Sequence, residues 1–217
     1  MDSVLPTICV AALPVIFAIT LHEAAHGYAA RHFGDPTAWQ AGRITLNPLR
    51  HIDLVGTIIV PALILLVSTG GLLFGWAKPV PVNFGRLREP KRDMLWVAAA
   101  GPAANFVMAL FWALMVKVAD VVPLGDYSEP LMRMGDIGIG INIALMVLNL
   151  LPLPPLDGGR IAVSLLPTRL AWRFAQLERF GFPILLVLLL TGVLGSLLSP
   201  PLRFFVHLID LIFQLPS

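Results

Sequence analysis

The sequence predicts an all-α polytopic membrane protein, with about five to six transmembrane or re-entrant helices and a short extended or hairpin element. Composition is the first observation behind this prediction. Of the 217 residues, 57% are hydrophobic and 13% are charged, and the mean hydropathy is +0.83. A soluble domain averages roughly 45–50% apolar and about 25% charged residues. The second observation is that apolar runs of spanning length recur along the chain.

The apolar runs give the expected helices in chain order. They cover residues 4–30, 54–74, 94–118, 137–151 with a continuation to 166, and 182–198. A weaker run at 204–215 is too short to cross a bilayer. The first run lacks a basic leader and a small-residue cleavage site, so we expect it to be a retained helix. We therefore expect one membrane-embedded domain over 1–217, with a core at about 4–166 and C-terminal helices at 182–215.

Composition also excludes several classes of protein. The net charge is +2 and the pI is near 9.0, but the basic residues lie in short groups between apolar runs. That arrangement is typical of membrane-protein loops and not of a nucleic-acid binder. The single cysteine, Cys9, excludes an intrachain disulfide framework and a cysteine metal cluster. We expect a lipid bilayer as a partner and no nucleic acid.

Loop charge predicts the orientation. Stretches 31–50, 78–93 and 160–179 are rich in Lys and Arg, whereas 120–136 is acidic. Lys- and Arg-rich loops face the cytoplasm, which places the first three stretches inside and the fourth outside. Both flanks of 54–74 then lie inside. That segment is either re-entrant or crosses and returns as extended chain, unless loop charge misleads at this point.

An H-E-x-x-H pattern lies within the first apolar run, at His22, Glu23 and His26. On a helix, positions i and i+4 share one face about 6 Å apart along the axis, so both imidazoles can reach one zinc ion. The glutamate between them is placed to handle a metal-bound water. Ionisable groups in an apolar segment are costly, which favours a functional site. His32 and His51 are interpreted as ordinary histidines, of the kind that snorkel or form a hydrogen bond near a helix end.

Two histidines leave a catalytic zinc ion one protein ligand short. Asp157 is the candidate for that ligand, because it follows a proline-rich break in a later apolar run. A carboxylate on a broken intramembrane helix indicates a functional site. The loop orientation places Asp157 and Glu23 at similar depth, near the cytoplasmic side.

These residues resemble the two diagnostic motifs of the site-2 protease family of intramembrane zinc metalloproteases. The second motif, N-x-x-P-x-x-x-L-D-G, matches residues 149–158. The resemblance implies that His22, His26 and Asp157 bind one Zn²⁺ per chain. It further implies that Glu23 is the general base.

The family asparagine thought to help hold substrate or the developing oxyanion corresponds to Asn149. The resemblance implies hydrolysis of peptide bonds within or near the transmembrane segment of single-span proteins, as in regulated intramembrane proteolysis. The chain has no room for a PDZ domain or a CBS pair, which fits a compact prokaryotic form in the cytoplasmic (inner) membrane. A non-proteolytic zinc-binding membrane protein or transporter is the alternative. Glu23 argues against it, because a pure zinc binder needs no base.

The proline-rich stretch at 76–84 favours extended backbone near the active site. Non-helical backbone at membrane depth requires a surrounding cavity. We expect the N–H groups of Val80, Val82 and Asn83 to be free to pair with an unwound substrate, although an inert connector is equally compatible. Asn105 either bonds the outer side of the zinc site or holds helices together, and the small residues around it favour packing. Asn142 either packs helices or lines the site.

Overall fold

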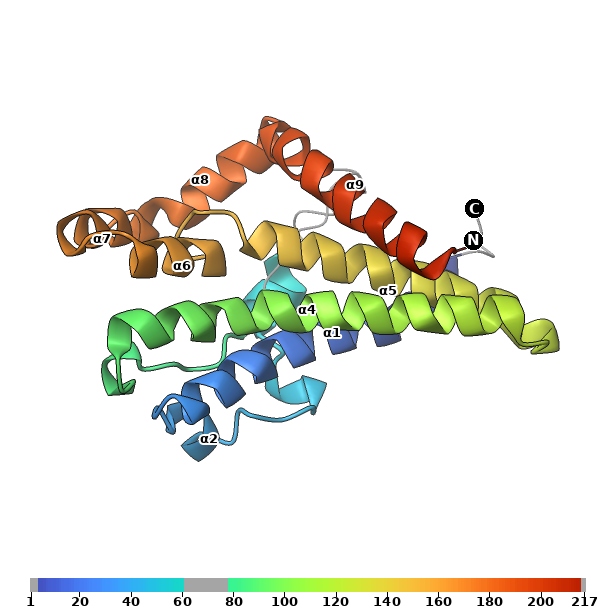
Figure 1. Cartoon of the computed structure of the whole chain (residues 1–217), viewed down its shortest axis with the longest axis horizontal. Helices are drawn as coiled ribbons and strands as arrows, with labels where there is room; N and C mark the ends of the chain where they lie inside the picture. Colours follow the sequence, from blue (N-terminus) through green and yellow to red (C-terminus); the bar gives the residue numbers. More distant parts are fainter. Residues whose placement is uncertain (1–3, 61–77, 216–217) are drawn as a thin grey trace.

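The computed structural model describes residues 4–60 and 78–215, which form helices joined by turns and extended segments, with no strand in those ranges (Figure 1). The long helices are α1 (Val4–His32), α4 (Pro90–Val121), α5 (Ser128–Asn149) and α9 (Val193–Phe213). Within the described ranges, 4 helical segments are long and apolar enough to cross a membrane, and each contains most of one of these helices. The prediction of an all-α membrane fold is therefore confirmed.

Shorter elements connect the long helices. They are α2 (Thr37–Gln40), η1 (Pro48–Arg50), the π-helical turn η2 (Leu54–Ile59), η3 (Phe84–Arg86), η4 (Gly125–Tyr127), α6 (Asp157–Leu165), α7 (Thr168–Ala175) and α8 (Glu178–Leu190). The apolar run expected at 54–74 begins with η2, and its remainder from residue 61 lies outside the described residues. Whether that run spans or is re-entrant stays a prediction.

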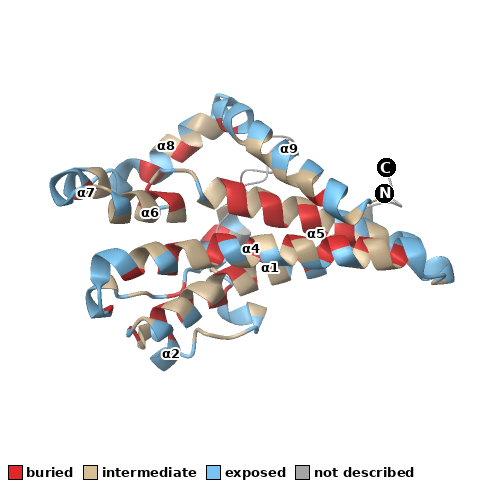
Figure 2. Ribbon diagram, in the orientation of Figure 1, coloured by how far each residue is buried: buried red, intermediate tan, exposed pale blue. Residues whose placement is uncertain are grey.

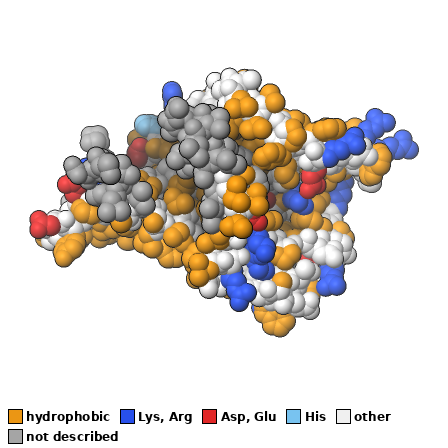
Figure 3. Space-filling view, turned by 180° about the vertical axis from the view of Figure 1, so that it is seen from behind, with side chains coloured by type: hydrophobic (Ala, Val, Ile, Leu, Met, Phe, Trp, Pro, Cys, Tyr) orange, Lys and Arg blue, Asp and Glu red, His pale blue; other side chains and the backbone are white. Residues whose placement is uncertain are grey.

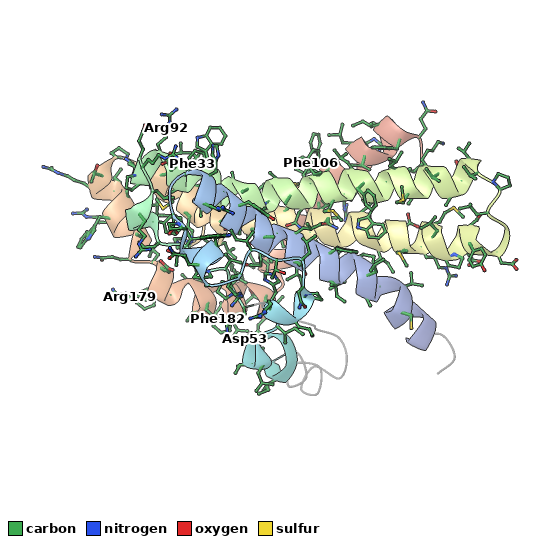
Figure 4. All side chains as sticks on the ribbon, turned by 90° about the horizontal axis from the view of Figure 1, so that it is seen from below. Phe33, Asp53, Arg92, Phe106, Arg179 and Phe182 are labelled. Carbon is green, nitrogen blue, oxygen red and sulfur yellow. The ribbon has the colours of Figure 1, made fainter. Side chains whose placement is uncertain are left out.

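The main core lies between α4, α5 and α9, where buried residues face one another (Figure 2). Trp112 of α4 is buried against Gly138 of α5, and a Cβ at Gly138 would come within 2.5 Å of the indole ring. Small residues allow helices to approach this closely, which is how helices associate without a hydrophobic driving force in lipid. On the α9 side, Phe106 of α4 meets Phe205 at 6.0 Å between ring centroids (Figure 4).

The C-terminal helices differ from the prediction. The expected run at 182–198 is divided, because Gly192 adopts a left-handed conformation with φ of 75° and separates α8 from α9. A left-handed residue ends a helix, and glycine adopts that conformation without steric cost. The segment 204–215, which we expected to be too short to span, is mostly the second half of α9. Hydropathy alone does not distinguish one long helix from two.

The two ends of the helix bundle carry opposite charge. The C-terminal end of α1, the N-terminal end of α4 and the helices α6 and α7 lie at one end, and η4 lies at the other (Figure 1). Lys and Arg side chains gather over the end that holds α6 and α7 (Figure 3). The acidic loop at 120–136 lies at the opposite end. The basic and acidic loops used to predict the orientation therefore lie at opposite ends of the folded helix bundle.

Candidate metal centre and cavity

Three possible metal ligands converge from two distant parts of the chain. His22 and His26 lie one turn apart on α1, and Asp157 is the first residue of α6. The Oδ2 atom of Asp157 lies 3.3 Å from the Nε2 atom of each histidine, and the two Nε2 atoms are 3.1 Å apart. Because all three side chains are mostly buried, little water competes for these atoms.

The outer nitrogens of the two imidazoles are occupied by acceptors. His22 Nδ1 lies 2.6 Å from Asn105 Oδ1, and His26 Nδ1 lies 2.7 Å from the Val97 carbonyl oxygen. An acceptor at Nδ1 fixes the proton there and leaves the lone pair of a neutral imidazole on Nε2. Two lone pairs and a carboxylate oxygen therefore face one another. Asp157 Oδ2 is buried and accepts no hydrogen bond from any described residue, so the donor set fits a cation.

Asn105 connects the candidate ligands to the helix core. Its Nδ2 donates to the Ala18 carbonyl oxygen at 3.1 Å and to Asn142 Oδ1 at 2.9 Å, and both asparagines are fully buried. These two donations fix the amide orientation, so that Oδ1 faces His22. Both roles considered for Asn105 are therefore present: it bonds a candidate ligand as well as holding helices together, so the favoured interpretation of packing was incomplete.

Gly101 allows α4 to lie against the imidazoles. A Cβ at this position would overlap His26 Nε2 and come within 2.6 Å of His22 Cε1. Only a residue without a side chain fits here. The sequence pattern did not predict this role for Gly101, although its position in the run of small residues at 98–104 was an available signal.

The proline-rich turn positions Asp157. After α5 ends at Asn149, the chain turns through residues 150–156, and α6 begins at Asp157. Cβ atoms at Gly158 or Gly159 would overlap the backbone of this turn, so the two glycines let α6 fold back onto it. The expected helix break and close backbone approach are both present.

The predicted site residues line a cavity of about 560 Å³. The lining includes both histidines and the aspartate, together with Glu23, Asn149, Arg160, Glu178 and the apolar residues Val97, Phe182 and Leu185. Phe182 lies on α8 (Figure 4), and together with Glu178 and Leu185 of the same helix it lines the cavity. Arg160 lies 3.5 Å from Glu178 Oε1 and stacks over the Phe84 ring at 4.8 Å.

The segment at 78–83 is neither helix nor strand and borders this cavity, as the predicted extended element requires. Its N–H groups are not free in the expected way. The Val80 N–H donates to Glu23 Oε2 at 2.7 Å, and the Asn83 N–H donates to Asp35 Oδ2 at 2.6 Å. Among the three, Val82 alone finds no acceptor among the described residues. The expected substrate-pairing edge is therefore largely occupied by the protein's own carboxylates.

His32 and His51 lie apart from the three candidate ligands: His51 is hydrogen-bonded, and His32 is exposed at the end of α1. The His51 Nε2 atom lies 3.0 Å from the Thr45 carbonyl oxygen, and His32 stacks edge-on against Phe33.

Comparison with known proteins identifies the family. Residues 128–192 match the model described as Peptidase family M50, a range that includes Asn149 and Asp157. The protein named "Putative zinc metalloprotease YwhC" from Bacillus subtilis is 38% identical over 194 residues, which is 88% of this chain and 84% of that protein. The chain belongs to peptidase family M50, the site-2 protease family.

Two mycobacterial proteins are also similar. "Putative zinc metalloprotease Rip2" from Mycolicibacterium smegmatis is 32% identical over 184 residues, and its counterpart from Mycobacterium tuberculosis is 28% identical over 182 residues. In each case the match covers 83% of this chain and 66% of the relative. No solved structure matches the chain significantly. Family membership and the apolar helices make the chain a membrane metalloprotease that uses zinc.

Proposed function

We propose that this M50 member is an intramembrane zinc endopeptidase of the H-E-x-x-H type, with His22, His26 and Asp157 as ligands of one Zn²⁺ and Glu23 as general base. The observation that supports this most directly is the meeting of three possible ligand atoms, two imidazole nitrogens and one carboxylate oxygen, in one cavity. Two imidazole nitrogens and one carboxylate oxygen form a ligand set typical of catalytic zinc, which keeps a position open for water.

The residues around the cavity divide the chemistry among them. A zinc ion bound there supplies Lewis acidity, which acidifies water and polarises a carbonyl oxygen. Glu23 lines the same cavity, where it accepts the proton of the attacking water and returns it to the leaving amine. The Asn105 side chain and the Val97 carbonyl oxygen hold the two imidazoles in fixed orientations, so the ligand lone pairs are directed before binding.

Asn149 is proposed to donate to the developing oxyanion. It lines the cavity, and its Nδ2 donates one hydrogen bond to the Leu145 carbonyl oxygen at 3.0 Å. A primary amide carries two N–H donors, so a second donor remains for the substrate. Preorganised donors directed at the oxyanion lower the barrier to acyl transfer.

The substrate proposed is the transmembrane segment of a single-span protein. Apolar side chains make up much of the cavity wall, which suits an apolar segment. A helical segment has its amides satisfied in lipid, so it must unwind before a peptide bond can be attacked. The basic residues gather at the end of the bundle that holds α6 and α7, which favours a cytoplasmic site. Because the relatives are bacterial, we place this protein, as one membrane-embedded domain over 1–217, in a bacterial inner membrane.

The test is zinc content together with cleavage, on detergent-purified wild type, Glu23→Gln and Asp157→Ala, with a model single-span substrate. We expect wild type and Glu23→Gln to carry about one zinc ion per chain. Cleavage should occur only in the wild type, with Glu23→Gln reduced at least about 100-fold, because the base contributes roughly 10²–10⁴-fold. Asp157→Ala should lose zinc. If Glu23→Gln cleaves the substrate at the wild-type rate, Glu23 is not the general base. A zinc-loaded wild type that cleaves no single-span protein would favour the non-proteolytic alternative.

A further inference from the structure

The carboxylate of Glu23 is held by the main chain of a segment that lies far away in sequence. Its Oε2 atom accepts the Val80 N–H at 2.7 Å, a length typical of a charge-assisted hydrogen bond. Val80 is 7% exposed, so water does not readily replace this contact. Among the described residues, no group donates to the other oxygen, Oε1.

The segment that carries Val80 is fixed on its N-terminal side. The Lys78 N–H donates to the His51 carbonyl oxygen at 2.9 Å, and Arg43 Nη2 donates to the Lys78 carbonyl oxygen at 2.9 Å. Arg43 Nη2 also lies 3.4 Å from the Pro79 carbonyl oxygen. These contacts hold the backbone immediately before Val80, so the direction of the Val80 N–H is set by the fold.

The C-terminal side of the segment is fixed as well. Asp35, which is 0% exposed, accepts the Asn83 N–H at 2.6 Å. Pro79 and Pro81 flank Val80, and each proline restricts its own φ and favours an extended conformation in the residue before it. Val80 therefore presents its N–H from a backbone with little freedom to turn away.

We infer that the Val80 main-chain N–H positions the general base by binding Oε2 of Glu23 and leaving Oε1 as the oxygen that exchanges protons with water and the leaving amine. This inference rests on the proposed function of Glu23. A glutamate side chain has three rotatable bonds, and anchoring one oxygen fixes where the other lies. Geometric control of this kind acts on the chemical step more than on substrate binding. The Val80 side chain is not needed for it.

Hydrogen–deuterium exchange tests the contact without any catalysis. Because prolines have no amide hydrogen, residues 78–83 contain only four, at Lys78, Val80, Val82 and Asn83. In zinc-free protein, Glu23→Ala should accelerate exchange at Val80 by roughly 10- to 100-fold, the factor that a hydrogen bond to a charged group supplies. Exchange at the other three amides should remain unchanged.

Glu178→Ala is the matched control for exchange. Glu178 is a second carboxylate that lines the same cavity, but it pairs with Arg160 and not with this segment. It should leave Val80 exchange at the wild-type rate. Unchanged exchange in Glu23→Ala, or equal acceleration in Glu178→Ala, would overturn the inference.

Kinetics test the consequence. Val80→Pro removes the N–H and extends the proline run, whereas Val80→Ala removes most of the side chain and keeps the N–H. We expect Val80→Pro to retain zinc and to lose at least about tenfold in kcat, with KM within about threefold of wild type. Val80→Ala keeps the donor, so its kcat should exceed that of Val80→Pro by at least about tenfold. Equal kcat in the two variants would contradict the inference.

The two hypotheses fail in different ways. If wild type cleaves no substrate, the proposed function fails, and the exchange experiment still decides whether Val80 binds Glu23. If wild type cleaves and the two Val80 variants are equal in kcat, the inference fails while the function stands. If Val80→Pro does not fold, the Glu23→Ala and Glu178→Ala exchange rates decide the matter.

Discussion

At the scale of single residues, one buried amide joins the candidate metal centre to the helix core. Asn105 has three partners: it accepts from His22 Nδ1 and donates to the Ala18 carbonyl oxygen and to Asn142. Leaving a buried polar group without a partner costs about 1–3 kcal/mol. Rotating the Asn105 side chain would break several of these bonds at once, so together they hold it in one orientation. The orientation of His22 is thereby tied to the packing of α1, α4 and α5.

Removing the amide of Asn105 should weaken zinc binding. Partners of ligating imidazoles typically contribute 10- to 100-fold to metal affinity, so Asn105→Ala should raise the zinc Kd by about that factor. Asn142→Ala is the control, because it truncates the same buried network but leaves the bond between Asn105 and His22 in place. Competition with a chelator measures both. An equal loss in the two variants would show that general core damage, and not the bond to His22, sets the affinity.

Asp35 is the other residue whose hydrogen bonds give a testable consequence. Burial alone would raise the pKa of its carboxyl, but hydrogen bonds from Thr37 and from the Asn83 N–H outweigh burial and lower the pKa below its ordinary value. A lowered pKa in the folded state means that the ionised carboxylate stabilises the fold. That contribution is fully present above the unfolded-state pKa of about 3.9, and is lost as the pH falls from there through the folded-state pKa.

Asp35→Asn should therefore lower the unfolding temperature at pH 7, where a hydrogen bond to a charged group is worth about 1.5–3 kcal/mol. The difference from wild type should shrink as the pH falls below about 4, because the wild-type carboxylate then becomes protonated. Asp126→Asn, at an exposed position in η4, should match wild type throughout. Thermal unfolding in detergent from pH 7 to pH 3 measures this. If the difference in unfolding temperature between wild type and Asp35→Asn does not vary with pH, the charge of Asp35 does not contribute to stability.

At the scale of elements, α4 lies directly against the imidazoles of α1 at Gly101. Substituting alanine for glycine inside a helix ordinarily stabilises the helix by about 1 kcal/mol. At Gly101 the added Cβ would overlap His26 Nε2, which is one of the candidate zinc ligands. The steric effect should dominate, because α4 or the imidazole must shift.

Gly101→Ala should consequently lose zinc affinity by at least about tenfold while remaining folded, since one displaced ligand removes a large part of the binding free energy. Gly140→Ala on α5 is the matched control, because a Cβ at Gly140 meets nothing within 4 Å. Metal analysis after dialysis against a chelator, beside circular dichroism, measures both. Wild-type zinc content in Gly101→Ala would mean that α4 moves aside without disturbing the ligands.

How far the sequence predicts each element depends on whether the cause is local. Apolar runs predicted α1 and α4 closely, and prolines predicted the turn before Asp157. Hydropathy did not predict the break at Gly192, because the runs on both sides are equally apolar. Nor did it predict that the Val80 N–H would bind Glu23, since a main-chain donor is present at almost every residue and its partner lies far away in the chain.

At the scale of the whole molecule, the candidate metal centre lies toward the basic end of the helix bundle. The candidate ligands lie on the part of α1 that leads into the basic end of the bundle, and Asp157 begins the helix that precedes α7. The acidic loop with η4 is at the far end of α4 and α5. Water and protons reach a buried site most easily from the nearer surface, so orientation decides which compartment supplies them.

Cysteine labelling should determine that orientation. Cys9 is the only cysteine of the chain, so Cys9→Ser gives a background without thiols, into which Glu89→Cys and Asp126→Cys are placed separately. Glu89 is exposed just before α4 at the basic end, and Asp126 is exposed in η4 at the acidic end. The Lys and Arg bias predicts that a membrane-impermeant maleimide labels Asp126→Cys in intact spheroplasts and labels Glu89→Cys only after lysis. The reverse pattern would place the candidate metal centre toward the outer face. Cleavage would then have to occur near the outer end of a substrate's transmembrane segment.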